Sequence, residues 1–276
     1  MNDFSEIRHG LQCLISAYNS PLGARLQEAI RVVQPDLPEI LQSNFNGQIH
    51  DLINETYLMS VSEHGDLNGG DHEDKFGRLS MWRAYAPKDG VAFVMNNTPF
   101  LNESSALGAF TSPVVYSMSD DFQPAFAEVV DSVESNLDLI KSLGGNFLHE
   151  ILMYSFRFAV QSTKHPSFKE EREWRVIYSP SILHGIGKLT DQQMVRVPTE
   201  IISLGGVPQR IFAIPFVDYP EEGFIGATPP SLLNRILIGP SLDSYAIRHA
   251  FVAELIRLNI PDAESKVVIT GVPLRI

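Results

Sequence analysis

Apolar residues at helical spacing dominate the first part of the chain. They recur three and four positions apart over residues 21–33 and again over residues 37–53, and prolines separate the two stretches. This spacing is typical of amphipathic helices, which carry one apolar face. Ser20 and Asp36 stand just before the two stretches, where such side chains often cap a helix. We therefore predict a helical N-terminal segment over residues 1–55.

From residue 56 onward, short runs of β-forming residues alternate with helical periods. Short runs rich in branched and aromatic residues predict strands, and such runs cover residues 56–62, 91–95, 113–117, 174–178, 235–238 and 266–270. Helical spacing covers residues 79–86, 122–140, 147–158 and 242–258. The pair Gly205-Gly206, inside residues 194–216, predicts a hairpin.

These elements together predict an α+β protein. The sequence has no internal repeat and no linker rich in Gly, Ser or Pro between two halves. We therefore expect residues 56–276 to form a single domain with a mixed, mainly antiparallel sheet flanked by helices.

Composition narrows the class of protein without naming a function. Hydrophobic residues make up 44% and charged residues 20% of the 276 residues, as in globular proteins. The net charge of −12 opposes a sequence-independent grip on duplex DNA, which relies on Lys and Arg. No window approaches the roughly 18 uncharged apolar residues that a membrane span needs, and no signal peptide is recognisable. Cys13 is the only cysteine, which excludes an internal disulfide, and we expect a cytoplasmic protein without membrane partners.

The run LSMWRAYAPKDGVAF, residues 79–93, is the first of two regions that could carry chemistry. Trp82 and Tyr85 lie three positions apart and therefore share one face of a helix. They would either anchor a core or form a stacking wall and a hydroxyl for a flat ligand ring. Arg83 lies off this face, where it would be solvated or would reach a phosphate.

The second region is a dense cluster of charges that leads into an apolar strand at residues 164–178. On a strand, Glu171, Glu173 and Arg175 would point to one face. Charged groups bury poorly unless they are paired. The cluster is therefore either a structural Glu–Arg ion pair at a sheet edge, or a carboxylate that Arg175 holds ionised for work on a ribose or a carbonyl.

Two further features are weaker signals of a functional site. Ser60 and Ser62, at the end of the first predicted strand, would direct both hydroxyls to the same side. The acidic loop at residues 63–74, which includes Asp66 and Asp71, has oxygen and imidazole groups that could gather a cation. Its spacing fits no calcium or zinc motif, so we predict a solvated loop and no metal site. The usual phosphate-binding glycine motifs and the serine hydrolase motif are absent from the sequence.

The two regions together resemble the signatures of a widespread bacterial family, domain of unknown function 2971. MWxxYA at residues 81–86, followed by GVxF at 90–93, is similar to its central signature. FxEExEWR at residues 168–175 is similar to its second signature. The tail, with ILIGP at 236–240 and VPLR at 272–275, is similar to its closing segment. The family's usual opening strand is not found, so helices replace it here or it precedes this chain.

A more distant resemblance links the chain to ADP-ribosyltransferase-like folds, in which a Ser-x-Ser strand precedes a Glu-x-Glu strand entry. This resemblance implies that Glu173 is the catalytic carboxylate and Glu171 its helper, with NAD as the substrate. Ser60 and Ser62 would then frame the nicotinamide pocket. The remaining candidates for binding substrate or cofactor are Trp82, Arg83, Tyr85 and Arg175. No other cofactor is implied.

The sequence leaves three functions open. The first is an NAD-using ADP-ribosyltransferase-like enzyme in a toxin, defence or stress setting, with a nucleotide ligand and a protein or nucleic-acid acceptor. The second is a non-catalytic protein- or nucleotide-binding module with a structural Glu–Arg network. The third is a metal-dependent nuclease or hydrolase that uses the acidic loop. A cleft lined by Ser60, Tyr85 and Glu173 would favour the enzyme, whereas burial of Glu173 against Arg175 without a cavity would favour the binding module.

Overall fold

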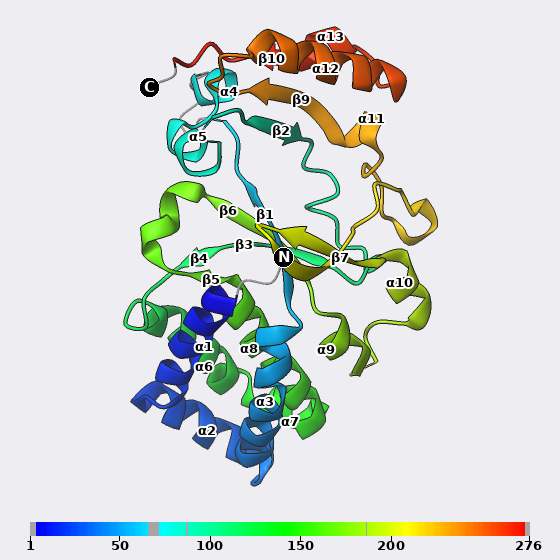
Figure 1. Ribbon diagram of the computed structural model, residues 1–276. Coiled ribbons are helices and arrows are strands. Elements are labelled where there is room, and N and C mark those ends of the chain that lie inside the picture. Colours follow the sequence, from blue (N-terminus) through cyan, green and yellow to red (C-terminus); the bar gives the residue numbers. More distant parts are fainter. Residues whose placement is uncertain (1–3, 66–71, 87, 186, 274–276) are drawn as a thin grey trace. The chain divides into compact units, whose positions relative to one another are not determined.

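The computed structural model of the chain describes residues 4–65, 72–86, 88–185 and 187–273. The chain forms two compact units, and each unit draws on two separate stretches of sequence. Unit 1 comprises Met1–Val61 and Gly108–Ala213, and unit 2 comprises Ser62–Leu107 and Ile214–Ile276. Figure 1 labels most of the helices and strands of both units.

Six helices of unit 1 enclose its main core. They are α1 (Phe4–Tyr18), α2 (Pro21–Val33), α3 (Leu37–Asn54), α6 (Phe122–Ser135), α7 (Leu137–Leu143) and α8 (Gly145–Ser162). The core contains fully buried aliphatic side chains from α2, α3 and α8, including Leu26, Ile30, Leu41, Leu52, Leu148 and Leu152. The helices bury these apolar faces because their removal from water is the main favourable term in folding.

Three small sheets complete unit 1. The first has the order β1-β6-β3, with β1 (Tyr57–Ser62), β6 (Glu173–Tyr178) and β3 (Phe110–Pro113), and β3 pairs antiparallel with β6. The second pairs β4 (Val115–Tyr116) with β5 (Thr163–Lys164) in parallel. The third is the hairpin of β7 (Thr199–Leu204) and β8 (Val207–Phe212). The short elements η1 (Pro166–Glu171), α9 (Pro180–Gly185) and α10 (Asp191–Arg196) connect these strands.

Unit 2 is built on a three-stranded sheet. Its order is β10-β9-β2, with β10 (Val267–Ile269) parallel and β2 (Val91–Met95) antiparallel to β9 (Leu233–Ile238). The helices α12 (Ser244–Arg257) and α13 (Ala263–Lys266) pack on this sheet. Ile236 and Ile238 alternate along β9 and join Leu255 of α12 in a second core. The remaining elements are α4 (His72–Phe76), α5 (Leu79–Tyr85), η2 (Pro220–Glu222) and α11 (Pro229–Leu232).

The structure confirms the predicted α+β class and most of the predicted elements. Ser20 caps α2, because its hydroxyl accepts from the N–H groups of Leu22 and Gly23. The predicted hairpin is present, and both glycines at its turn, Gly205 and Gly206, have positive φ, which suits a tight hairpin turn.

Four expectations differ from the structure. Asp36 precedes α3 but makes no side-chain cap. The helix predicted over 122–140 is divided at Asn136 into α6 and α7. The strand predicted at 113–117 is divided between β3 and β4. Within the described residues the strands form four small sheets instead of one. The predicted domain boundary at residue 55 stays a prediction.

No helix in the described part of the chain combines the length and the apolar character that a membrane crossing requires.

Candidate functional site: a buried ionic cluster in unit 1

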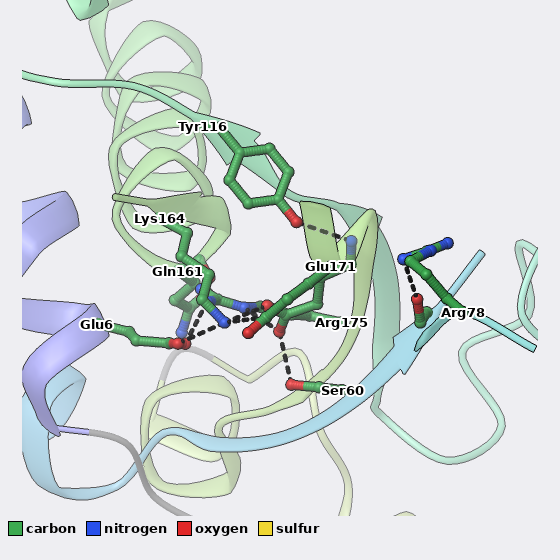
Figure 2. A network of polar contacts seen from close by, with 10 residues as sticks. Glu6, Ser60, Arg78, Tyr116, Gln161, Lys164, Glu171 and Arg175 are labelled. Atoms are coloured by element: carbon green, nitrogen blue, oxygen red, sulfur yellow. Dashed lines mark hydrogen bonds and ion pairs between the residues drawn. The ribbon is translucent and has the colours of Figure 1, made fainter. Parts of the chain in front are cut away.

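Two charged side chains at the start of strand β6 lie in the interior of unit 1. Glu173 is 3% exposed and Arg175 is 0% exposed. The two residues lie on the same face of the strand, because side chains alternate with a period of two. Lys164 at the end of β5 is also buried, at 6%. Figure 2 shows Lys164 and Arg175 gathered with Glu6, Ser60 and Glu171 in one polar network.

Glu173 uses both of its carboxylate oxygens within this network. The Ser60 hydroxyl donates to Oε1 at 2.5 Å, and the Arg175 Nε–H donates to the same oxygen at 2.9 Å. The Lys164 ammonium donates to Oε2 at 2.6 Å. A carboxylate offers about four acceptor positions, so three of them are already occupied by donors from the chain itself.

Lys164 is the hub of the cluster. Its Nζ lies 2.6 Å from Glu173, 2.7 Å from Glu171 and 2.8 Å from Glu6. An ammonium group has three N–H donors, so the three carboxylates saturate it. The Nζ also lies 4.9 Å from the centre of the Phe168 ring, which adds a cation–π contact.

Arg175 joins three separate parts of unit 1. Besides its bond to Glu173, its Nη1 donates to the Gln161 carbonyl at 2.7 Å, and its Nη2 pairs with Glu6. Glu6 belongs to α1, and Gln161 belongs to the last turn of α8. The guanidinium therefore links both helices to β6.

Polar residues around the cluster hold its backbone in place. The Glu173 N–H donates to the Tyr116 hydroxyl oxygen at 2.8 Å. The Gln161 side chain donates to the hydroxyls of Ser179 at 2.8 Å and Thr56 at 3.1 Å. Buried polar groups need such partners, because an unsatisfied group costs free energy on folding.

Burial and charge oppose each other at Glu173 and Lys164, and charge prevails at both. Burial alone would raise the pKa of Glu173, but hydrogen bonds from Lys164 and Ser60 and the charge of Arg175 outweigh burial and lower the pKa. Burial alone would lower the pKa of Lys164, but its three carboxylate partners outweigh burial and raise it. Both groups are therefore firmly charged at neutral pH. Burial raises the pKa of the neighbouring Tyr116.

The structure brings four of the predicted site residues together in unit 1, namely Ser60, Glu171, Glu173 and Arg175. Glu171 does not share the strand face of Glu173 and Arg175, because it ends the short helix η1 and Arg172 has φ of 43°. Glu171 still reaches Lys164 from that position. Ser62 belongs to unit 2, where its hydroxyl accepts from the Arg78 Nη1 at 3.1 Å.

The sequence patterns did not identify two central members of the cluster, Lys164 and Glu6. Lys164 stands inside the charge-rich run, so its proximity to Glu173 was a signal that could have identified it. Glu6 lies 169 positions before Arg175 in the sequence, and nothing in its local pattern distinguishes it from a solvated acid. Only tertiary packing of α1 on β5 brings Glu6 to the cluster.

The remaining candidates lie on α5 in unit 2. Trp82 is 5% exposed, and its Nε1–H donates to the Phe76 carbonyl at 2.8 Å. Its ring lies over Gly239, where an added Cβ would stand 2.7 Å from ring carbon Cε3. Trp82 is therefore a core anchor with a satisfied polar tip. Arg83 and Tyr85 are exposed, Tyr85 at 65%.

A small cavity of about 270 Å³ lies in unit 2. Its lining residues are Asp74, Lys75, Arg235, Leu237 and Val268. Arg235 already pairs with Asp74. Small-molecule sites usually have volumes of about 300–1,000 Å³, so this cavity is smaller than a typical ligand site.

Within the described residues, no group of three or more His, Cys, Asp or Glu side chains is arranged to hold a metal ion. Asp66 and Asp71 of the acidic loop lie outside the described residues.

The comparisons with known proteins give one family. No curated protein and no solved structure matches the chain. Residues 81–176 match the model of a family described as a protein of unknown function, DUF2971. The matched stretch begins in α5, includes β2 to β5 and the helices α6 to α8, and ends inside β6. This match supports the resemblance to domain of unknown function 2971, and the matched residues include both signatures that carry it, at 81–93 and 168–175.

Proposed function

We propose that this chain is a non-catalytic binding module, and that its buried ionic cluster has a structural role. The module would engage a partner without chemical turnover. The cluster would hold α1, α8, β5 and β6 in one arrangement, so that the outer surface of unit 1 is presented in a defined shape.

One observation carries this proposal, the occupation of both Glu173 carboxylate oxygens by donors from the chain itself. A catalytic carboxylate must touch its substrate, yet both oxygens of Glu173 are occupied by Ser60, Lys164 and Arg175. Its side chain is only 2% exposed. A sugar hydroxyl would have to displace charged donors from a buried site, which costs more than exchanging a water molecule on a surface.

The geometry also explains why such a cluster would be kept as a unit. Desolvation of buried ions is expensive, and it is offset only where the ions are well paired and hydrogen-bonded. The three acids and two cations satisfy that condition together. Removal of one member would leave uncompensated charge inside unit 1, so the cluster favours a single packing arrangement.

A second candidate function rests on the contact between Ser60 and Glu173. A serine from β1 beside an ionised glutamate at the start of β6 is the relation that the ADP-ribosyltransferase resemblance implies, and the lowered pKa of Glu173 suits stabilisation of a positive ribose. In that reaction nicotinamide would leave NAD, and a protein or nucleic-acid acceptor would attack the ribose. A toxin, defence or stress setting would accompany such an activity. The carboxylate would first have to turn away from Lys164.

One experiment separates the two candidates. Wild type, Glu173→Gln and Glu200→Gln are incubated with NAD and a cell lysate, and nicotinamide release and Tm are measured in parallel. For a binding module we expect no nicotinamide release above the lysate background from any of the three, and a lower Tm for Glu173→Gln. Glu200→Gln is the matched control, because Glu200 is an exposed glutamate of β7 outside the cluster, and its Tm should equal that of wild type. Release by wild type that Glu173→Gln abolishes would overturn the binding module and establish the enzyme.

A further inference from the structure

Helix α8 has an apolar face on each side. Leu148, Leu152 and Phe156 point into the core of unit 1. The opposite side exposes four large apolar side chains to similar extents, Phe147 at 41%, Ile151 at 44%, Tyr154 at 38% and Phe158 at 43%. A helix at the surface of a monomer normally turns a polar face to water. The second apolar face therefore needs an explanation.

The four exposed residues follow the spacing of a coiled-coil seam. They stand 4, 3 and 4 positions apart, which is the alternation of the two core positions in a heptad. Side chains at this spacing form a narrow stripe along one side of a helix. A stripe of this kind fits against the matching stripe of another helix.

We propose that the exposed stripe of α8 is the seam of a homodimer, and that it packs against α8 of a second copy in antiparallel orientation. The spacing reads the same in both directions. An antiparallel copy therefore sets Phe147 against Phe158 of its partner, and Ile151 against Tyr154. Two-fold symmetric interfaces require this property, in which residue i meets residue j and j meets i.

Two unpaired charges on α8 support the antiparallel orientation. Glu150 is exposed, and no ion pair involves it in the described part of the chain. Arg157 is 7% exposed and bonds only to the Met153 carbonyl, at 2.9 Å, while its Nη1 has no hydrogen-bond partner among the described residues. Its guanidinium lies over the Tyr154 ring, 4.9 Å from the centre, and therefore beside the stripe.

Glu150 and Arg157 occupy equivalent positions in successive heptads, on the same edge of the stripe. In an antiparallel pair these edges meet, so Glu150 of each copy approaches the edge that carries Arg157 of the other. Charges that flank a seam set partner choice and orientation in coiled coils. Each glutamate would then approach a nearly buried arginine of opposite charge, whose Nη1 has no hydrogen-bond partner within the described part of one copy.

The size of the stripe determines how strongly two copies should associate. Four half-exposed side chains cover less than the roughly 800 Å² per partner of a standard interface. The dimer should therefore be weak and reversible, with its mass depending on protein concentration.

Sedimentation velocity over a dilution series tests the proposal on the full chain. We expect the mass of wild type to rise toward that of a dimer with concentration, and Ile151→Asp to stay a monomer throughout. Ile256→Asp is the matched control, since Ile256 is an exposed isoleucine of α12 at 58%, and it should behave as wild type. A wild type that stays monomeric, or an Ile151→Asp variant that still dimerises, would overturn the proposal.

Cross-linking tests the orientation independently. Cys13 is buried, so a cysteine introduced on the stripe is the reactive one. We expect a mixture of Ile151→Cys and Tyr154→Cys to form more disulfide dimer under mild oxidation than either variant alone. Equal yields from the mixture and from the single variants would rule out the antiparallel register.

Discussion

The Lys164 ammonium lies 2.6 Å from Oε2 of Glu173, with both side chains almost fully buried. The same ammonium also pairs with Glu171 and Glu6, so it balances acids from three different elements. Lys164 thus contacts all three carboxylates of the cluster, and two of them, Glu6 and Glu173, also pair with Arg175.

Replacement of Lys164 by methionine should therefore destabilise unit 1 strongly. Methionine has a similar length but removes the ammonium that all three carboxylates share, which leaves Arg175 as the one cation of the cluster, and breaking a buried pair in this way typically costs about 3–5 kcal/mol. Urea unfolding followed by circular dichroism measures the loss. Lys169→Met is the control, because Lys169 is exposed on η1, and it should change stability by less than about 0.5 kcal/mol. Similar stabilities for the two variants would contradict a hub role for Lys164.

Ser60 and Glu173 should be energetically coupled. Hydrogen bonds to charged groups contribute about 1.5–3 kcal/mol, and Ser60→Ala removes one from Oε1 of Glu173. In a double-mutant cycle with Glu173→Gln, we expect the loss of unfolding free energy in the double variant to be about 1 kcal/mol smaller than the sum of the two single losses. The reason is that both substitutions remove the same contact.

Ser142→Ala provides the comparison for this cycle. Its hydroxyl donates to the Leu139 carbonyl at 2.7 Å, so it shares no partner with Glu173. The losses from Ser142→Ala and Glu173→Gln should simply add. Strict additivity for Ser60 as well would mean that its contact with Glu173 contributes nothing to stability.

The cluster shows which parts of a buried site local sequence patterns can predict. The shared face of Glu173 and Arg175 could be predicted, because strand periodicity depends only on neighbouring residues. The left-handed backbone at Arg172 could not, since arginine has no local preference for positive φ. Glu6 joins the cluster only through helix packing, which no pattern within α1 reveals. The sequence therefore predicted the pair at the centre but not its counterions.

The helices show the same division. Apolar spacing located α2 and α3 well, because burying an apolar face determines where a helix forms. Capping was less predictable. Ser20 has the extended backbone that suits a cap, with ψ of 174°, whereas Asp36 has ψ of −1° and makes no side-chain cap. The residue type alone did not reveal that difference.

Stability should depend on pH at both ends of the scale. The lowered pKa of Glu173 means that its contribution is present above its unfolded pKa, about 4.3, and is lost as pH falls through its folded pKa. The raised pKa of Lys164 means that its contribution is complete below its unfolded pKa, about 10.4, and is lost as pH rises further.

Unfolding free energies of wild type and Lys164→Met across this range isolate the lysine term. The difference between the two proteins should be constant at neutral pH and should shrink above about pH 10.4, where wild type begins to lose the contribution of the ammonium. A difference that stays constant into the alkaline range would mean that the pKa of Lys164 is the same in the folded and unfolded chain.

Trp82 and Gly239 should be mutually dependent for packing in unit 2. An added Cβ at Gly239 would lie 2.7 Å from Cε3 and 2.8 Å from Cζ3 of the Trp82 ring, well inside van der Waals contact. Gly239→Ala should therefore force the ring to move and cost about 1–3 kcal/mol, as overpacking of a core does. Thermal unfolding measures the cost.

Gly47→Ala is the matched control, because Gly47 lies within α3 with no heavy atom within 4 Å of an added Cβ. It should raise stability by about 0.5–1 kcal/mol, since alanine favours a helix. If Gly239→Ala were as stable as wild type, the ring of Trp82 would have room to shift, and its role as a fixed core anchor would be wrong.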